Sequence, residues 1–123
     1  MKIKIGLFLL TAASLFVPSL QAQQRRTTQP ANQCMSFGKD SNGGVTLTNT
    51  CNFNIVIIQV ANNGHFIDPG LIYPGQSAPM MFAQPGDNVP YTVDACTAPG
   101  QPSNPSTGQW PPQYQGQFEC VVE

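Results

Sequence analysis

The sequence predicts an all-β fold: a small antiparallel β-sandwich or open barrel, stapled by two disulfides, that follows a cleaved signal peptide. Three observations support this prediction. Short runs of β-branched and aromatic residues recur, turn-forming Gly, Pro and Asn residues separate them, and no helical period is visible after the leader. The 123-residue chain is long enough for one small core. We therefore expect a single β domain over residues 33–123.

Residues 1–22 have the three zones of a secretory signal peptide. Lys2 and Lys4 supply positive charge, the stretch 5–17 is largely apolar, and a short segment with small residues ends at Ala22. An apolar stretch of about 13 residues is shorter than the roughly 20 that a membrane-spanning helix needs. We therefore expect a mature protein without a membrane span, secreted or located in the periplasm.

The first half of the domain contains the clearest strand signals. Residues 23–32 are polar, with no apolar period, and are predicted to be a disordered lead-in. Short strands are predicted over 33–37 and over 45–48, where apolar and polar residues alternate. The strongest signal is the β-branched run 55–60. Since it has apolar residues on both faces, it predicts the central strand.

Turn signals divide the second half of the domain. Asn62-Asn63-Gly64 predicts a tight turn, after which residues 65–67 return antiparallel to the central strand. Asp68-Pro69-Gly70 and Tyr73-Pro74-Gly75 both have the Pro and Gly that a type II turn favours. Three further strands are predicted, and Pro79 places the first of them at an edge. These strands cover 77–82, 89–95 and 117–122.

Four cysteines in a small exported chain predict two disulfides. Four cysteines allow three pairings, which the sequence alone does not distinguish. We favour Cys34–Cys51 with Cys96–Cys120, because each pair brackets one strand–loop–strand segment. Zinc would require close pairs of ligands, whereas the gaps here are 16, 44 and 23 residues. We therefore expect no metal site.

Residues 97–116 predict a long surface loop, because five prolines and the lack of an apolar run exclude a helix or a central strand. The loop contains the only tryptophan, Trp110, and a tyrosine, Tyr114, among glutamines and prolines. Exposed aromatic rings with amide neighbours can stack on sugars or anchor in a partner's groove. Trp110 and Tyr114 are therefore the predicted ligand contacts. The alternative is that Trp110 folds back as a lid over one end of the sandwich.

Charge and motif content exclude several classes of function. Removal of the leader leaves three basic and six acidic residues, too few bases to bind a polyphosphate by counterion release. Nucleic acid is therefore not an expected partner, and no cofactor motif is present. His65, Asp68 and Ser77 could form a hydrolytic set, but none lies in a nucleophile-elbow motif and all three have turn or strand positions as a simpler explanation. No catalytic residue is predicted.

Three short motifs in the sequence are similar to motifs of a known class of proteins. They are Asn49-Thr50-Cys51 at a strand end, the turn Ile72-Tyr73-Pro74-Gly75-Gln76-Ser77 with its leucine shifted to Leu71, and Ala95-Cys96-Thr97-Ala98-Pro99. With these motifs the chain resembles small exported bacterial two-disulfide β-sandwich proteins. The resemblance spans residues 34–120 and implies a disulfide-stapled sandwich without an assigned activity, so it implies no functional residues.

The sequence thus favours a non-enzymatic binding or interaction module for a glycan, a cell-envelope component or a protein. Low charge, many amides and one aromatic loop favour this hypothesis. A structural subunit that assembles through sheet edges is an alternative. A small hydrolase that uses His65 and an acid is a further alternative.

Overall fold

A computed structural model describes residues 25–86 and 89–123, so the predicted signal peptide 1–22 lies outside the described residues. The all-β prediction is confirmed, and within the described residues the only helical elements are two short 3-10 turns, η3 (Asn32–Cys34) and η4 (Met81–Ala83). No helix in this part of the chain is long and apolar enough to cross a membrane. The strands are β1 (Met35–Lys39), β2 (Val45–Asn49), β3 (Ile55–Ala61), β4 (Phe66–Ile72), β5 (Ser77–Pro79), β6 (Tyr91–Thr97), β7 (Gln101–Ser103) and β8 (Glu119–Val121).

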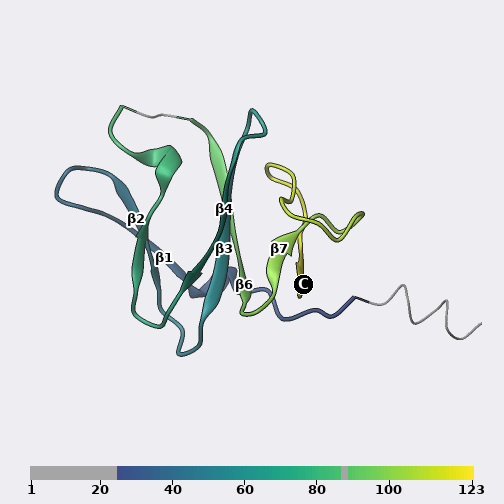
Figure 1. Cartoon of the computed structure of the whole chain (residues 1–123). Coiled ribbons are helices and arrows are strands. Elements are labelled where there is room, and N and C mark those ends of the chain that lie inside the picture. The colour runs from purple at the N-terminus through teal and green to yellow at the C-terminus, as the bar shows by residue number, and fades with distance from the viewer. Residues whose placement is uncertain (1–24, 87–88) are drawn as a thin grey trace, which may run out of the picture.

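The strands form three small antiparallel sheets, with the orders β1-β2-β5, β4-β3-β6 and β7-β8. Figure 1 shows β1 and β2 on the left, β3, β4 and β6 in the centre and β7 on the right. The hydrophobic core lies between the first two sheets, because its members come from both of them and from the segments beside them. They are Ala31, Cys34, Leu47, Ile55, Ile57, Ile72, Met80 and Ala95.

The prediction that residues 55–60 form the central strand is confirmed. β3 pairs with β4 on one side and β6 on the other, and all seven of its residues are buried. Ile55 and Ile57 belong to the core, and Ile58 alternates with them toward the opposite face. That second face looks toward β7 and β8, because Cys96, the register partner of Val56, is bonded to β8. β3 is apolar on both faces because each face is covered by another layer.

Both predicted disulfides are confirmed, and no cysteine is free. Cys34–Cys51 closes the open end of the β1–β2 hairpin, since Cys34 lies just before β1 and Cys51 just after β2. Cys96–Cys120 joins β6 to β8 and so ties the central sheet to the third sheet. Two disulfides are typical of a protein that folds in an oxidising compartment.

Asp68-Pro69-Gly70 does not form the predicted turn, because all three residues lie inside β4. Ile57 pairs with Gly70 and Gln59 with Ile67, so Asp68 and Pro69 together oppose a single residue of β3. This is a β-bulge. Proline is tolerated in it because β4 is an edge strand, where a missing N–H breaks no interior hydrogen bond. The turn predicted at Tyr73-Pro74-Gly75 is present: Gln76 N donates to Tyr73 O, and Gly75 has φ +77°.

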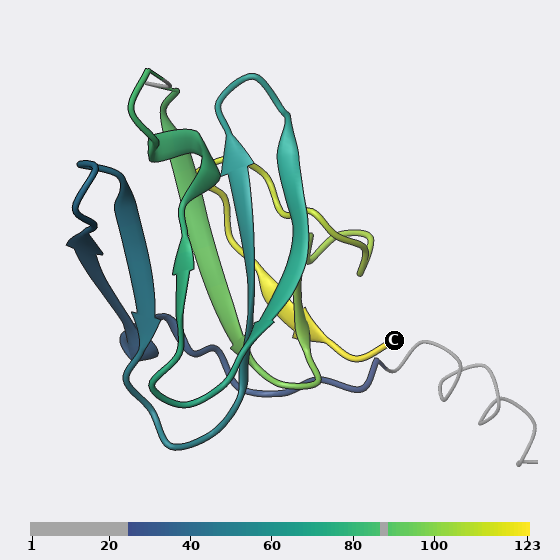
Figure 2. The same cartoon turned by 60° about the vertical axis from the view of Figure 1, so that its left-hand side comes forward.

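Residues 25–32 also differ from the predicted disordered lead-in 23–32. They form an extended segment whose Ala31 N–H donates to Ala95 O, while the Thr97 N–H donates to Gln29 O. Closer to the N-terminus, the Thr28 N–H donates to Cys120 O. Figure 2 shows this segment in dark blue along the bottom of the molecule. A polar composition leaves a chain without a core of its own, but here the open edges of β6 and β8 supply its hydrogen bonds.

Several predicted strand boundaries shift where the chain bends. Residues 33–37 begin as η3, and β1 starts at Met35. β5 ends at Pro79 and continues as η4, while its position at the edge of the β1-β2-β5 sheet is confirmed. The Pro-rich loop 97–116 includes the end of β6 and all of β7, which pairs with β8. β7 contains Pro102, a residue that is compatible with a short strand at a sheet edge.

Candidate binding site

Trp110 packs against the central sheet. Its ring meets Phe66 edge-on, with ring centroids 5.4 Å apart and an interplanar angle of 74°. Phe66 is the register partner of Val60, which is buried on the β3 face turned toward β7 and β8. Trp110 is half-buried as a result. It thus helps to cover that face of the central sheet, whereas the lid alternative placed it over one end of the sandwich.

Tyr114 lies in a different environment, in an open groove of about 390 Å³. The loop is held beside β6 here, because the Gln115 N–H donates to Thr92 Oγ1 at 3.0 Å. Trp110 is not part of this groove, so the two predicted contacts do not share one surface. The lining residues are Phe82, Ala83, Val89, Pro90, Tyr91 and Tyr114.

Two aromatic residues that the sequence analysis did not select also line the groove. Phe82 belongs to η4 and Tyr91 begins β6, and their ring centroids lie 6.2 Å apart. The sequence analysis placed Phe82 in the predicted strand 77–82 and Tyr91 in the predicted strand 89–95. A usable signal exists in the sequence, because the Pro85-Gly86 turn between them favours a chain reversal that brings the two rings together.

A buried glutamine in β3 positions one of these rings. Gln59 is almost fully buried, and its Oε1 accepts a hydrogen bond of 2.8 Å from the Met81 N–H. Met81 is the first residue of η4, next to Phe82. A polar side chain in an otherwise apolar strand therefore anchors the turn that carries one wall of the groove.

The groove is aromatic and has no charged side chain among its lining residues. Burial raises the pKa of the Tyr91 phenol above its ordinary value of 10.0, so this hydroxyl stays neutral at physiological pH. The available chemistry is thus aromatic ring surface together with the phenolic hydroxyl groups of Tyr91 and Tyr114. It fits a neutral ligand that has both an apolar face and hydrogen-bonding groups.

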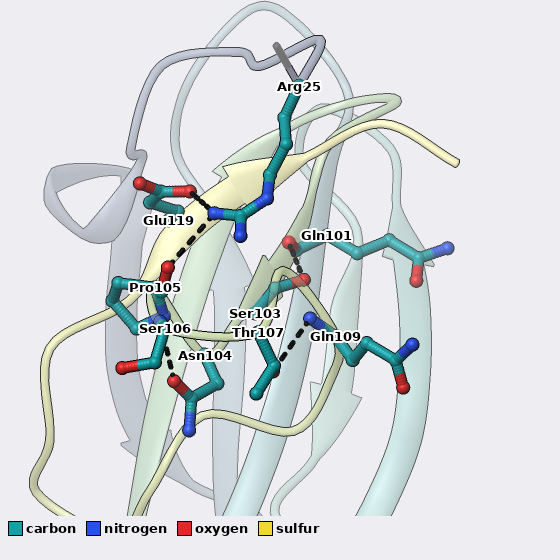
Figure 3. A network of polar contacts seen from close by, with 9 residues as sticks. All are labelled: Arg25, Gln101, Ser103, Asn104, Pro105, Ser106, Thr107, Gln109 and Glu119. Carbon is teal, nitrogen blue, oxygen red and sulfur yellow. Dashed lines mark hydrogen bonds and ion pairs between the residues drawn. The ribbon is translucent and has the colours of Figure 1, made fainter. Parts of the chain in front are cut away.

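A second hollow, of about 270 Å³, is lined by other residues of the C-terminal part of the chain and is polar. It is lined by Asn104, Pro105, Ser106, Gln113 and Gln117. Figure 3 shows the hydrogen bonds that hold its wall together. Arg25 Nη1 donates to Pro105 O at 2.9 Å and to Glu119 Oε1 at 3.1 Å, and Asn104 Oδ1 accepts from the Ser106 N–H.

Other contacts in Figure 3 stay within the loop. The Gln109 N–H donates to Thr107 Oγ1, and Ser103 Oγ donates to Gln101 O. The Arg25–Glu119 ion pair is solvent-exposed and contributes little to stability. These groups serve to fold the loop and to fasten the N-terminal segment. The hydrogen bonds drawn in Figure 3 are therefore directed at the protein itself.

Two of the residues considered for hydrolysis, His65 and Ser77, are not brought together. His65 precedes the start of β4, and its N–H donates to Asn63 Oδ1 in the turn. Ser77 follows the far end of β4, where its hydroxyl pairs with Thr48 Oγ1 at 2.6 Å. A strand of seven residues, about 20 Å in length, separates the two. No group of three or more His, Cys, Asp or Glu side chains is placed to hold a metal ion among residues 25–86 and 89–123.

The comparisons with known proteins add no assignment to this geometry. No protein-family model, curated protein or solved structure matches the chain.

Proposed function

We propose that the protein is a non-enzymatic binding module, secreted or periplasmic, that receives an uncharged sugar in the groove of Phe82, Tyr91 and Tyr114. One observation carries the proposal. Three aromatic residues from three separate segments border one open groove that has no charged lining residue.

The chemistry of the groove favours a sugar over other neutral ligands. A pyranose ring has an apolar face of C–H groups and a rim of hydroxyl groups. Aromatic faces complement the former, while the hydroxyl groups of Tyr91 and Tyr114 can hydrogen-bond the latter. An anionic ligand would find no cation in the lining. The openness of the groove suits one residue of an extended glycan chain.

The proposed compartment rests on two features of the chain. Residues 1–22 have the zones of a signal peptide, and two disulfides link the mature part. Glycans of the cell envelope are accessible to a protein outside the cytoplasm. The cell envelope is therefore where we expect the ligand.

The test is a binding measurement on the full chain, exported with its own leader so that the disulfides form. A glycan array identifies a neutral ligand, and titration calorimetry then compares wild type, Tyr114→Ala and Tyr73→Ala. Tyr73 is a matched control, because it is 52% exposed and does not line the groove. Because an aromatic anchor contributes a few kcal/mol, Tyr114→Ala should weaken binding at least about tenfold, and Tyr73→Ala should not.

Two results would contradict the proposal. One is an array on which no uncharged glycan retains the wild-type chain. The other is a glycan whose affinity is the same for wild type and Tyr114→Ala, since its site would then lie elsewhere.

A further inference from the structure

In the described part of the chain, every sheet edge but one is protected against pairing with a further strand. Proline occupies β4 within its bulge, the end of β5 and the middle of β7, and proline is a common device against edge-to-edge pairing. The N-terminal segment covers the other two edges. Its Pro30 bridges Cys96 of β6, and its Thr27 bridges Val121 of β8.

The outer edge of β1 has neither a proline nor a covering segment. Its five residues contain no proline, its register with β2 is unbroken, and four of the five are exposed. Within the described residues no strand pairs with its outer edge. Figure 2 shows β1 at the left-hand border of the molecule. Lys39 is the only charged residue in the strand.

The hydrogen bonds at the two ends of the β1–β2 ladder show which backbone groups point outward. The Thr50 N–H donates to Cys34 O, and the Asp40 N–H donates to Gly44 O. Because hydrogen-bonded pairs alternate along an antiparallel ladder, Ser36 and Gly38 are also bonded to β2. The N–H and C=O groups of Phe37 and Lys39 therefore face away from β2. So does the C=O of Met35, whose N–H is donated to Asn32 O.

The side chain at the centre of this edge is also exposed. Phe37 is 50% exposed, although its register partner Leu47 is fully buried in the core. Cross-strand aromatic pairs stabilise antiparallel sheets when they lie on one face of neighbouring strands. A further strand beside β1 would bring a side chain directly against Phe37.

From these observations we infer that the outer edge of β1 binds β1 of a second copy of this chain. Antiparallel pairing about a two-fold axis at Phe37 makes the two Phe37 residues exchange their N–H···O bonds. It also directs each Lys39 N–H to the C=O of Met35 on the other copy. The two Phe37 rings then lie side by side.

The charges agree with this self-pairing. In the symmetric register each Lys39 opposes Met35 and not the second Lys39, so no like charges meet across the axis. The same surface serves both copies, which is the isologous arrangement of a closed dimer. The pairing joins two β1-β2-β5 sheets into one continuous sheet, and each outer edge of that sheet ends at the proline of β5. Growth therefore stops at two copies.

The first test is the concentration dependence of molecular mass, measured by sedimentation on the purified full chain. Wild type should shift from monomer to dimer as its concentration rises. Phe37→Lys should remain a monomer, because it sets two charges against each other at the axis. Phe37→Pro should do so as well, and its fold should survive because the Phe37 N–H faces away from β2. Phe53→Ala is the control: Phe53 is 38% exposed outside β1, and its loss should leave the dimer unchanged.

Amide hydrogen exchange provides a second, residue-level readout. At high concentration the amides of Phe37 and Lys39 should exchange more slowly, while those of Ser36 and Gly38 should not change. A wild-type chain that stays monomeric at every concentration overturns the inference. So does a dimer that persists in Phe37→Lys. A monomeric chain whose Phe37 amide is protected by a co-purified peptide would show that a foreign strand occupies the edge, and it also overturns the inference.

Discussion

At the scale of single residues, buried polar side chains position the surrounding segments. Gln59 holds η4 through the Met81 N–H, and Asn49 Nδ2 donates to Phe53 O and Ile72 O. Asn32 contributes both of its amide atoms: Oδ1 accepts from the Ala95 N–H, and Nδ2 donates to Asp94 Oδ1. Gln59 and Asn49 are buried and have partners, as buried polar groups require, while Asn32 is an exposed residue whose amide reaches β6.

Asp94 provides a prediction about pH. It is only 6% exposed, and burial raises its pKa above 3.8, although the hydrogen bond from Asn32 acts in the opposite direction. A raised pKa means that the folded chain binds the proton more tightly than the unfolded chain. The ionised carboxylate therefore lowers stability above the raised pKa, and this cost disappears as the pH falls below 3.8.

Asp94→Asn keeps an acceptor for Asn32 but removes the charge. It should increase the free energy of unfolding at neutral pH, and the gain should vanish below pH 3.8. Denaturant titration at both pH values measures this difference. An equal gain at both would show that the carboxylate charge is not the cause.

At the scale of the elements, the loop after β7 acts as a third layer. Residues 104–118 contain no strand, yet Trp110 packs on Phe66, and Gln115 is bonded to β6. The Cys96–Cys120 disulfide fastens the same layer to the central sheet. This layer explains why β3 has apolar residues on both faces.

The packing of Trp110 leads to a second prediction. The sequence analysis expects Trp110 to contact a ligand, whereas its contact with Phe66 gives it a role in stability. Trp110→Ala should lower the melting temperature, and a double-mutant cycle with Phe66→Ala should return a coupling of about 0.5–1.5 kcal/mol. Additive effects of the two substitutions would mean that the rings do not stabilise each other.

At the scale of the whole molecule, the N-terminal segment completes the fold. Residues 26–31 are bonded to the outer edges of both β6 and β8, and Ala31 enters the core. One extended segment therefore bridges two sheets and protects both of their edges.

A third prediction concerns a chain from which this segment is removed. A chain that begins at Asn32 should unfold at a lower temperature and should self-associate, because the edges of β6 and β8 become free. A chain that begins at Arg25 is the control and should behave as the full mature protein does. Introducing Phe37→Lys into both chains separates this association from pairing through β1. An Asn32 chain with unchanged melting temperature would contradict the role given to the segment.

Local patterns were sufficient for much of the fold. The β-branched run 55–60 identified the central strand, Asn62-Asn63-Gly64 the tight turn, and cysteine spacing the preferred disulfides. At the candidate site the sequence pointed to Tyr114, but it grouped this residue with Trp110 and missed Phe82. The separation of the two aromatic residues depends on what each packs against, and sequence spacing does not contain that information.

The sequence by itself determined the all-β class and the central strand, because each depends on residue types within one short segment. It favoured the disulfide pairing that is present but did not decide it, because four cysteines allow three pairings. Only the tertiary structure decided which edges are closed, that Asp68-Pro69 form a bulge and not a turn, and that three aromatic residues share one groove. These features depend on backbone groups and rings that are distant in sequence, and they become neighbours only when the layers pack.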